Sequence, residues 1–133
     1  MLLDTCFCID LMRESHKGLS GPATAKMAEL KEHEISISLF TLCELRAGAE
    51  LSKNPQLELR KINLLTEYVE ILYPDSSFPV IYGEAEAVLR EKGARIPVMD
   101  LLIGITAKAA EQAVLTRDTE HFSRIPGLVV ETY

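Results

Sequence analysis

Five short, mostly apolar runs, separated by longer segments with helical spacing, constrain the fold of this chain more than any other feature. Such runs are typical of strands that are buried on both sides. Strands that alternate with helices pair in parallel, and the helices cover both faces of the sheet. At 133 residues the chain has the length of one domain. The sequence therefore predicts an α/β fold, a single domain over residues 1–133 with a mainly parallel central sheet flanked by helices on both faces.

The boundaries of the expected elements follow from breaker residues and from the apolar spacing. Strands are expected at Met1–Leu3, Glu34–Leu39, Glu70–Tyr73, Ala113–Leu115 and Leu128–Val130. Helices are expected at Cys6–Met12, 22–33, Phe40–Ser52, 55–69, Pro79–Lys92 and Val98–Glu111, and a turn with a short helix at Thr116–Arg124. The polar stretch Glu14–Ser20, which is followed by Gly21 and Pro22, predicts a loop.

Charge and cysteine content limit the partners and the compartment. Lys and Arg total 14 against 20 Asp and Glu, so the net charge of −6 excludes binding of nucleic acid through a broad basic surface. Such a contact must be local or mediated by a metal ion. The three cysteines form neither a disulfide framework nor a CxxC zinc pattern, which favours a reducing cytoplasm. Acidic residues interrupt the apolar N-terminus, and the longest uncharged run is Ile35–Cys43, so neither a signal peptide nor a membrane segment is expected.

Four acidic residues lie in unusually apolar or structured parts of the sequence: Asp4, Glu44, Asp100 and Asp118. Asp4 and Asp118 each follow an expected strand, and parallel sheets bind ligands at the carboxyl ends of their strands. Carboxylates that converge there repel one another unless they hold a cation, and an all-oxygen set favours Mg²⁺ or Mn²⁺. Such a site can hydrolyse a phosphodiester bond. The alternatives are structural, since the three Asp residues could cap helices and Glu44 could lie on a solvated helix face.

Two glycines lie one helical turn beyond two of these acids. Gly48 follows Glu44 by four residues and Gly104 follows Asp100 by four, which places each pair on one helix face. Glycine inside a helix costs roughly 1 kcal/mol relative to alanine. Either something must approach closely beside the acids, or the glycines serve helix packing.

Four segments of the chain carry the acids within longer motifs. They are LLDTCFCIDL (Leu2–Leu11), SLFTLCELRAGA (Ser38–Ala49), IPVMDLLIGITA (Ile96–Ala107) and LTRDTEHFSRIPGL (Leu115–Leu128). In this order and spacing they resemble PIN-domain ribonucleases and, within them, the VapC-like toxins of prokaryotic toxin–antitoxin pairs. The resemblance implies that the catalytic residues, which bind one or two Mg²⁺ or Mn²⁺ ions, are Asp4, Glu44, Asp100 and Asp118.

Further residues near the expected site have two interpretations each. By resemblance Thr116 could orient a water and Thr5 could support the first Asp, although Thr5 could also simply begin a helix. Cys6 and Arg117 stand where the family often has Asn. Cys6 cannot replace an amide hydrogen bond and is either a small buried hydrophobe or a thiolate ligand, whereas Arg117 either contacts phosphate or lies in solvent. His121 could bind phosphate or help proton transfer.

The remaining histidines and several cations are expected at the surface. His16 and His33 have no spacing partner for a zinc site. Four basic residues either form a local rim that binds RNA or are merely solvated: Lys17, Arg46, Lys108 and Arg117.

The sequence and the resemblance together predict a Mg²⁺- or Mn²⁺-dependent endoribonuclease of the cytoplasm that acts as a toxin on an RNA substrate. The resemblance further implies a homodimer and a cognate antitoxin protein that covers the site, often with a basic side chain. A non-catalytic RNA- or protein-binding module on the same fold is the alternative. A phosphatase of the haloacid dehalogenase kind would need a second Asp where the chain has Cys6.

Overall fold

Five short strands form one sheet in the order β3–β2–β1–β4–β5, and all four strand pairs are parallel. The computed structural model describes residues 1–133. The strands are β1 (Leu2–Leu3), β2 (Ser36–Ser38), β3 (Glu70–Leu72), β4 (Val114–Leu115) and β5 (Val130–Glu131). The helices are α1 (Thr5–Lys17), α2 (Pro22–Glu29), α3 (Leu39–Glu50), α4 (Pro55–Thr66), α5 (Phe78–Glu91), α6 (Val98–Ala109) and α7 (Thr119–Phe122). The α/β prediction is confirmed, and the sheet is parallel throughout.

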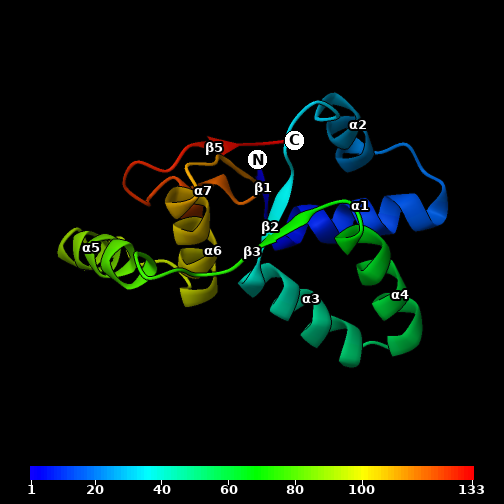
Figure 1. Ribbon diagram of the computed structural model, residues 1–133, viewed down its shortest axis with the longest axis horizontal. Coiled ribbons are helices and arrows are strands. Elements are labelled where there is room, and N and C mark those ends of the chain that lie inside the picture. Colours follow the sequence, from blue (N-terminus) through cyan, green and yellow to red (C-terminus); the bar gives the residue numbers. More distant parts are fainter.

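The sheet separates two apolar cores. Figure 1 shows α1 to α4 on one side of the strands and α5 to α7 on the other. Successive residues of a strand point to opposite faces, so Leu2 packs with α5, α6 and α7, whereas Leu3 packs with α1, α3 and α4. In the same way Val114 and Leu115 of β4 belong to different cores. Helices therefore flank both faces, as the apolar strand pattern predicted. No helix of the protein is both long and apolar enough to span a membrane.

Two of the sequence predictions fail at the ends of elements. The segment Glu14–Ser20 was expected to be a loop, but α1 continues to Lys17 and ends at Gly18 with a positive φ of 61°. The helix continues because Glu14 is buried and has partners in α2. The last strand is Val130–Glu131 rather than Leu128–Val130, since Leu128 packs against the core beside α6 instead of pairing with β4. The other helices and strands begin or end within a few residues of their expected limits.

Glu14 joins α1 to the start of α2. Its carboxylate accepts hydrogen bonds from the backbone N–H of Thr24 (2.8 Å) and of Ala23 (3.4 Å). A Cβ on Gly21, the N-cap of α2, would overlap this carboxylate. The hydrogen bond from the Thr24 N–H is the main cause that lowers the pKa of Glu14 below its ordinary value. Glu14 therefore takes the place of an N-cap side chain for α2.

The substitution Glu14→Gln is expected to destabilise the fold, because the amide keeps the acceptor oxygen but loses the charge. A carboxylate whose pKa is lowered by folding contributes stability above its unfolded pKa, and this contribution disappears as the pH falls through the folded pKa. Urea unfolding at pH 7 should therefore show a lower midpoint for the variant, and the difference should close in acid. The exposed Glu32→Gln serves as control. Equal midpoints at pH 7 would contradict the capping role.

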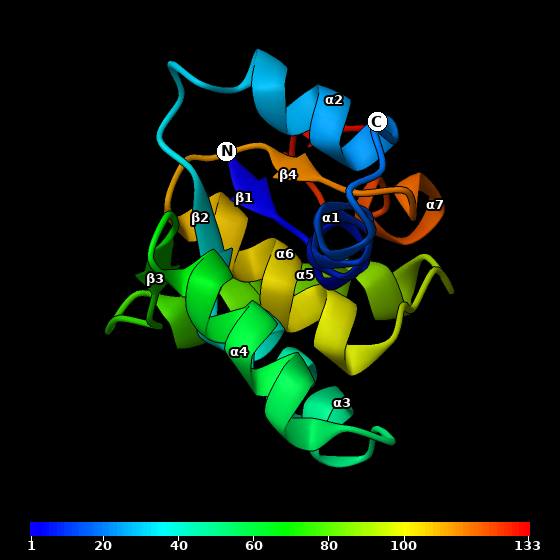
Figure 2. The same ribbon diagram turned by 90° about the vertical axis from the view of Figure 1, so that its right-hand side faces the viewer.

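The strand order brings two distant parts of the chain together beside β1. The chain moves from β1 to β2 on one side, whereas β4 pairs with the other side of β1, so the order reverses between β1 and β4 (Figure 2). Open α/β sheets bind ligands at this reversal, at the carboxyl ends of the strands. Because Leu3 pairs with Leu115, the next residues, Asp4 and Thr116, leave the sheet side by side.

Candidate metal centre

Asp4 lies at the end of β1, is 5% exposed and is the N-cap of α1. Its Oδ1 accepts a hydrogen bond from the Thr5 N–H (2.7 Å), so the capping alternative is confirmed for this residue. Its Oδ2 accepts hydrogen bonds from the hydroxyl of Thr116 (2.8 Å) and from the thiol of Cys6 (3.1 Å). The fixed orientation of this carboxylate therefore involves more than capping.

Glu44 reaches the same edge from α3, which begins directly after β2. The hydroxyl of Thr5 donates to Oε2 of Glu44 (2.5 Å), so Thr5 connects Glu44 to Asp4 through its hydroxyl and its backbone N–H. Glu44 is half-buried and does not lie on a fully solvated helix face. Thr5 begins α1 and supports the acids at the same time.

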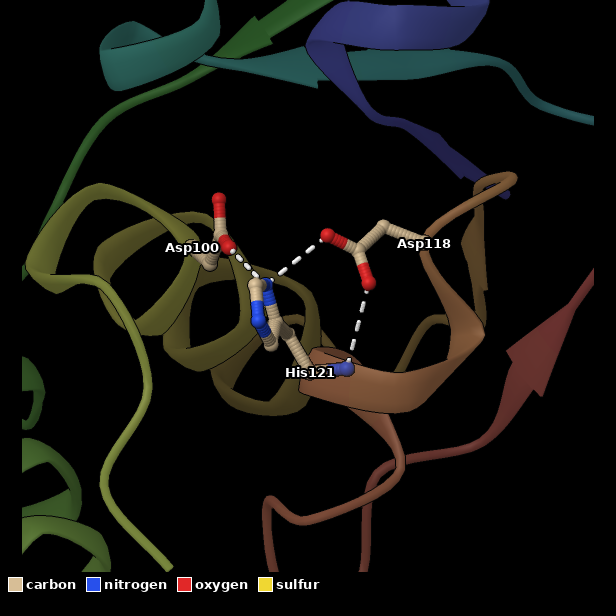
Figure 3. Close-up of side chains that lie close together, drawn as sticks. All are labelled: Asp100, Asp118 and His121. Atoms are coloured by element: carbon tan, nitrogen blue, oxygen red, sulfur yellow. Dashed lines mark hydrogen bonds and ion pairs between the residues drawn. The ribbon is translucent and has the colours of Figure 1, made fainter.

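Asp100, Asp118 and His121 form the tightest cluster of the edge. The imidazole Nδ1 of His121 lies 2.8 Å from Oδ2 of Asp100 and 2.8 Å from Oδ2 of Asp118. In Figure 3 the ring stands between the two carboxylates. One ligand atom of each of the three residues lies within 4.8 Å of the others. Asp118 also caps α7 by accepting from the His121 N–H (3.3 Å). Asp100 caps nothing, because it lies in the first turn of α6, whose N-cap is Pro97.

The charge at this edge favours a bound cation. Burial is the main cause that raises the pKa of Asp100, and the negative charges of Asp4 and Asp118 raise it further. His121 acts in the opposite direction through its hydrogen bond and charge. A divalent ion would offset the repulsion among the carboxylates, and the oxygen and imidazole donors present are ligands that such ions accept. The residues therefore fit a metal ion.

The four acids lie at one edge of the sheet, but they do not all meet directly. Asp100 and Asp118 converge with His121, whereas Asp4 and Glu44 lie outside that close group and are connected through Thr5. Thr116 joins the two pairs, because its hydroxyl donates to Asp4 and accepts from the backbone N–H of Asp118 (2.9 Å). The convergence of His121 on the acids could not be predicted from its position alone.

The substitution Thr116→Val should slow any reaction at this site without removing an acid. The isosteric valine leaves Asp4 without one donor and the Asp118 N–H without its acceptor. Loss of a group that orients a metal ligand typically costs about 10–100-fold in activity or metal affinity. Calorimetry should show that the metal affinity of the variant is lower by about 10–100-fold. Thr106→Val is the matched control, since Thr106 is equally buried and its hydroxyl donates to the Leu102 carbonyl in α6. Unchanged affinity in the Thr116 variant would remove its positioning role.

Cys6 differs from both of its expected interpretations, whereas Arg117 is exposed, as one of its two interpretations expected. Cys6 is neither a buried hydrophobe nor a thiolate facing a cation, because its thiol is part-exposed and donates to Asp4. The thiol thus supplies a hydrogen bond to Asp4 at a position where the sequence predicted none. Arg117 is turned toward α1, where its guanidinium pairs with Oδ2 of Asp10 (3.0 Å). Tyr133 donates to the same carboxylate oxygen (2.8 Å), and this ion-pair cluster holds the segment that carries Asp118.

Asp10 is a buried acid of α1 that was not among the predicted site residues, although its position in the sequence carried a signal. Asp10 follows the buried Phe7 by three residues and precedes Glu14 by four, so all three lie on the face of α1 that packs against the protein. An acid on a buried helix face requires partners. Arg13 and Arg117 both pair with Asp10.

The structure separates the roles of the two helix glycines, Gly104 and Gly48, and removes one residue from the expected basic rim. A Cβ on Gly104 would meet Ile125, Leu128 and Phe122, so this glycine serves packing, whereas Gly48 faces open space. Lys108 lies in the last turn of α6, away from Asp100, and donates to the carbonyl of Pro126 (2.7 Å), so it does not belong to the rim. The three remaining members of the expected rim and both other histidines are exposed: Lys17, Arg46, Arg117, His16 and His33.

Comparisons with known proteins agree with this geometry. Residues 1–128 match the family model of the PIN domain. The chain is 31% identical to Ribonuclease VapC1 of Haemophilus influenzae (strain R2866), over 96% of this chain and 92% of the relative. It is 28% identical to the tRNA(fMet)-specific endonuclease VapC of Shigella flexneri, over 99% of this chain and 96% of the relative. The solved structure of VapBC2 from Rickettsia felis, bound to a DNA fragment from its promoter, superposes with a TM-score of 0.90 at 27% identity and covers 99% of this chain and 97% of that chain.

Proposed function

The chain belongs to the VapC-like ribonucleases of the PIN-domain family, and on this basis we propose that it is a metal-dependent endoribonuclease that acts as the toxin of a toxin–antitoxin pair. The observation that carries the proposal is the edge where β1 and β4 end. There Asp100 and Asp118 meet, Asp4 is fixed by two threonines, and Glu44 is connected to it. A cluster of this charge in a chain of net charge −6 requires a cation before it can approach RNA.

We propose that Asp4, Glu44, Asp100 and Asp118 hold one or two Mg²⁺ or Mn²⁺ ions and are the catalytic residues. A bound divalent ion lowers the pKa of a water and polarises the phosphate that the water attacks. The chain contributes the fixed orientation of the carboxylates. The backbone N–H of Thr5 and the hydroxyl of Thr116 donate to different oxygens of the Asp4 carboxylate, which fixes its orientation.

The substrate and the partners follow from the relatives. Two of them carry the names of a ribonuclease and of a tRNA endonuclease, so we propose RNA, and tRNA first, as the substrate. The superposed VapBC2 structure is a complex, and we propose a cognate antitoxin protein that covers the acidic edge with a basic side chain. A homodimer in the cytoplasm completes the proposal.

The test is cleavage of RNA by the purified, antitoxin-free chain. A single-stranded RNA and a tRNA mixture are each incubated with Mg²⁺, with Mn²⁺ and with EDTA. We expect cleavage that requires a metal ion and returns when metal replaces EDTA. Binding of RNA without cleavage in the presence of either Mg²⁺ or Mn²⁺ would overturn the proposed nuclease function and favour a non-catalytic binding module. Cleavage that persists in EDTA would overturn the metal site. Size-exclusion chromatography with light scattering tests the homodimer.

A further inference from the structure

We propose that His121 is a direct metal ligand through Nδ1, and that with Asp100 and Asp118 it forms a mixed nitrogen and oxygen site for a first-row divalent transition ion, Mn²⁺ in preference to Mg²⁺. The inference rests on the proposed metal site and adds a nitrogen donor to it. The acids alone would make an all-oxygen site, which Mg²⁺ suits as well as Mn²⁺ does. The imidazole changes that preference.

The distances around Nδ1 carry the first argument. Nδ1 lies 2.8 Å from one carboxylate oxygen of Asp100 and 2.8 Å from one of Asp118. Neighbouring ligands of an octahedral ion, at about 2.1 Å from it, lie about 3 Å apart. One proton on Nδ1 can form a linear hydrogen bond to only one of the two oxygens, since hydrogen bonds weaken steeply away from linearity. The three ligand atoms lie within 4.8 Å of one another, a spacing that is compatible with one metal ion between them.

The position of the ring carries the second argument, because the fold holds it there. The His121 N–H donates to Asp118, so the backbone of His121 is tied to one of the two acids. The next residue, Phe122, is fully buried and packs against α6 where Gly104 leaves room. α6 also carries Asp100. The burial of Phe122 therefore fixes the distance between the histidine and the aspartate on the neighbouring helix.

The chemistry of the donors gives the expected selectivity. Mg²⁺ prefers oxygen ligands and retains several waters, whereas Mn²⁺, which begins the first-row series of divalent transition ions, accepts nitrogen as well as oxygen ligands. Replacing the imidazole nitrogen by an oxygen should therefore weaken Mn²⁺ more than Mg²⁺. Groups that merely orient a ligand account for 10–100-fold in affinity, so loss of a direct ligand should lower Mn²⁺ affinity by about tenfold or more.

Pulsed electron paramagnetic resonance of Mn²⁺ bound to the full chain tests the proposal directly. An imidazole nitrogen that coordinates Mn²⁺ gives a ¹⁴N modulation of the spin echo. We expect this signal in the wild type and in the exposed-histidine controls His16→Asn and His33→Asn, and its loss in His121→Asn. Asparagine offers an amide oxygen near the position of Nδ1, so the variant exchanges nitrogen for oxygen. Calorimetry should show that this variant loses more affinity for Mn²⁺ than for Mg²⁺.

Absence of the nitrogen signal in the wild type would overturn the proposal, and this measurement needs no variant to fold. Tighter Mn²⁺ binding by His121→Asn would overturn it as well, since the ring would then act as a cation that competes with the metal. The outcome is separable from that of the proposed function. RNA cleavage without nitrogen coordination would support the proposed nuclease and overturn His121 as a metal ligand. Nitrogen coordination without RNA cleavage would support His121 as a ligand and overturn the nuclease.

Discussion

Asp100→Asn should lower the rate of RNA cleavage by at least about 10³-fold, the equivalent of ~4 kcal/mol of transition-state stabilisation. Asparagine keeps the shape and one acceptor for His121 but removes the charge that the metal ion requires. Asp100 is half-buried and its carboxylate lies beside His121 and Asp118, so the substitution removes a charged ligand from the closest group of residues at this edge. Initial rates at saturating Mn²⁺ measure the loss.

The same substitution should not destabilise the metal-free protein. Folding raises the pKa of Asp100, so the contribution of this group to stability is present in acid and is lost as the pH rises through the folded pKa. At neutral pH in EDTA, Asp100→Asn should therefore unfold at a higher temperature than the wild type. Asp75→Asn is the contrasting control, because hydrogen bonds from Ser77 lower the pKa of the exposed Asp75, so loss of its charge should lower the unfolding temperature. Loss of activity together with a lower unfolding temperature would show that Asp100 is structural.

Gly104→Ala and Gly48→Ala should change stability in opposite directions. A methyl group on Gly104 would overlap Ile125 and lie 3.2 Å from Leu128 and 3.3 Å from Phe122. Overpacking of this kind costs about 1–3 kcal/mol. Nothing lies near the corresponding position of Gly48, so alanine there gains about 1 kcal/mol of helix propensity. The propensity gain applies at both positions, since both glycines lie inside helices, so the two variants should differ by the overpacking cost, about 1–3 kcal/mol.

Denaturant unfolding measures the difference in the free energy of unfolding, when both variants show the same dependence of that free energy on denaturant concentration. Because Phe122 lies next to His121, Gly104→Ala should also weaken metal binding, whereas Gly48→Ala should leave it unchanged. Equal stability of the two variants would mean that α6 and the segment around Ile125 can move apart at little cost, and the close packing would not hold the site.

The order of the strands and helices could be predicted because each one follows from a local pattern of apolar, polar and breaker residues. Short apolar runs, a glycine or proline at the breaks, and acids after the first and fourth strands are all visible in the sequence. The ends of α1 and β5 could not be predicted in this way. Glu14 belongs to a helix because of partners in another helix, and Leu128 leaves the sheet to pack against α6. Tertiary contacts outweigh local preference at both places.

The features of the candidate site also fall into two groups, those that the sequence predicts and those that depend on tertiary contacts. The four acids and the two threonines were predicted from spacing and resemblance, and their common position at one sheet edge follows from the strand order. The partners of Arg117, the thiol hydrogen bond of Cys6 and the position of His121 depend on side chains that meet only in the folded chain. The single domain and the roles of the site residues stay predictions for experiment.

The bond between Thr116 and Asp4 joins residues that are 112 positions apart in the chain. Synthesis reaches the first acid of the edge, Asp4, at least 112 residues before it reaches Thr116, Asp118 and His121. A partly synthesised chain therefore cannot complete the metal centre, whatever the state of its first helices. Assembly of this edge therefore depends on contacts of high sequence separation, which form late relative to local helix contacts.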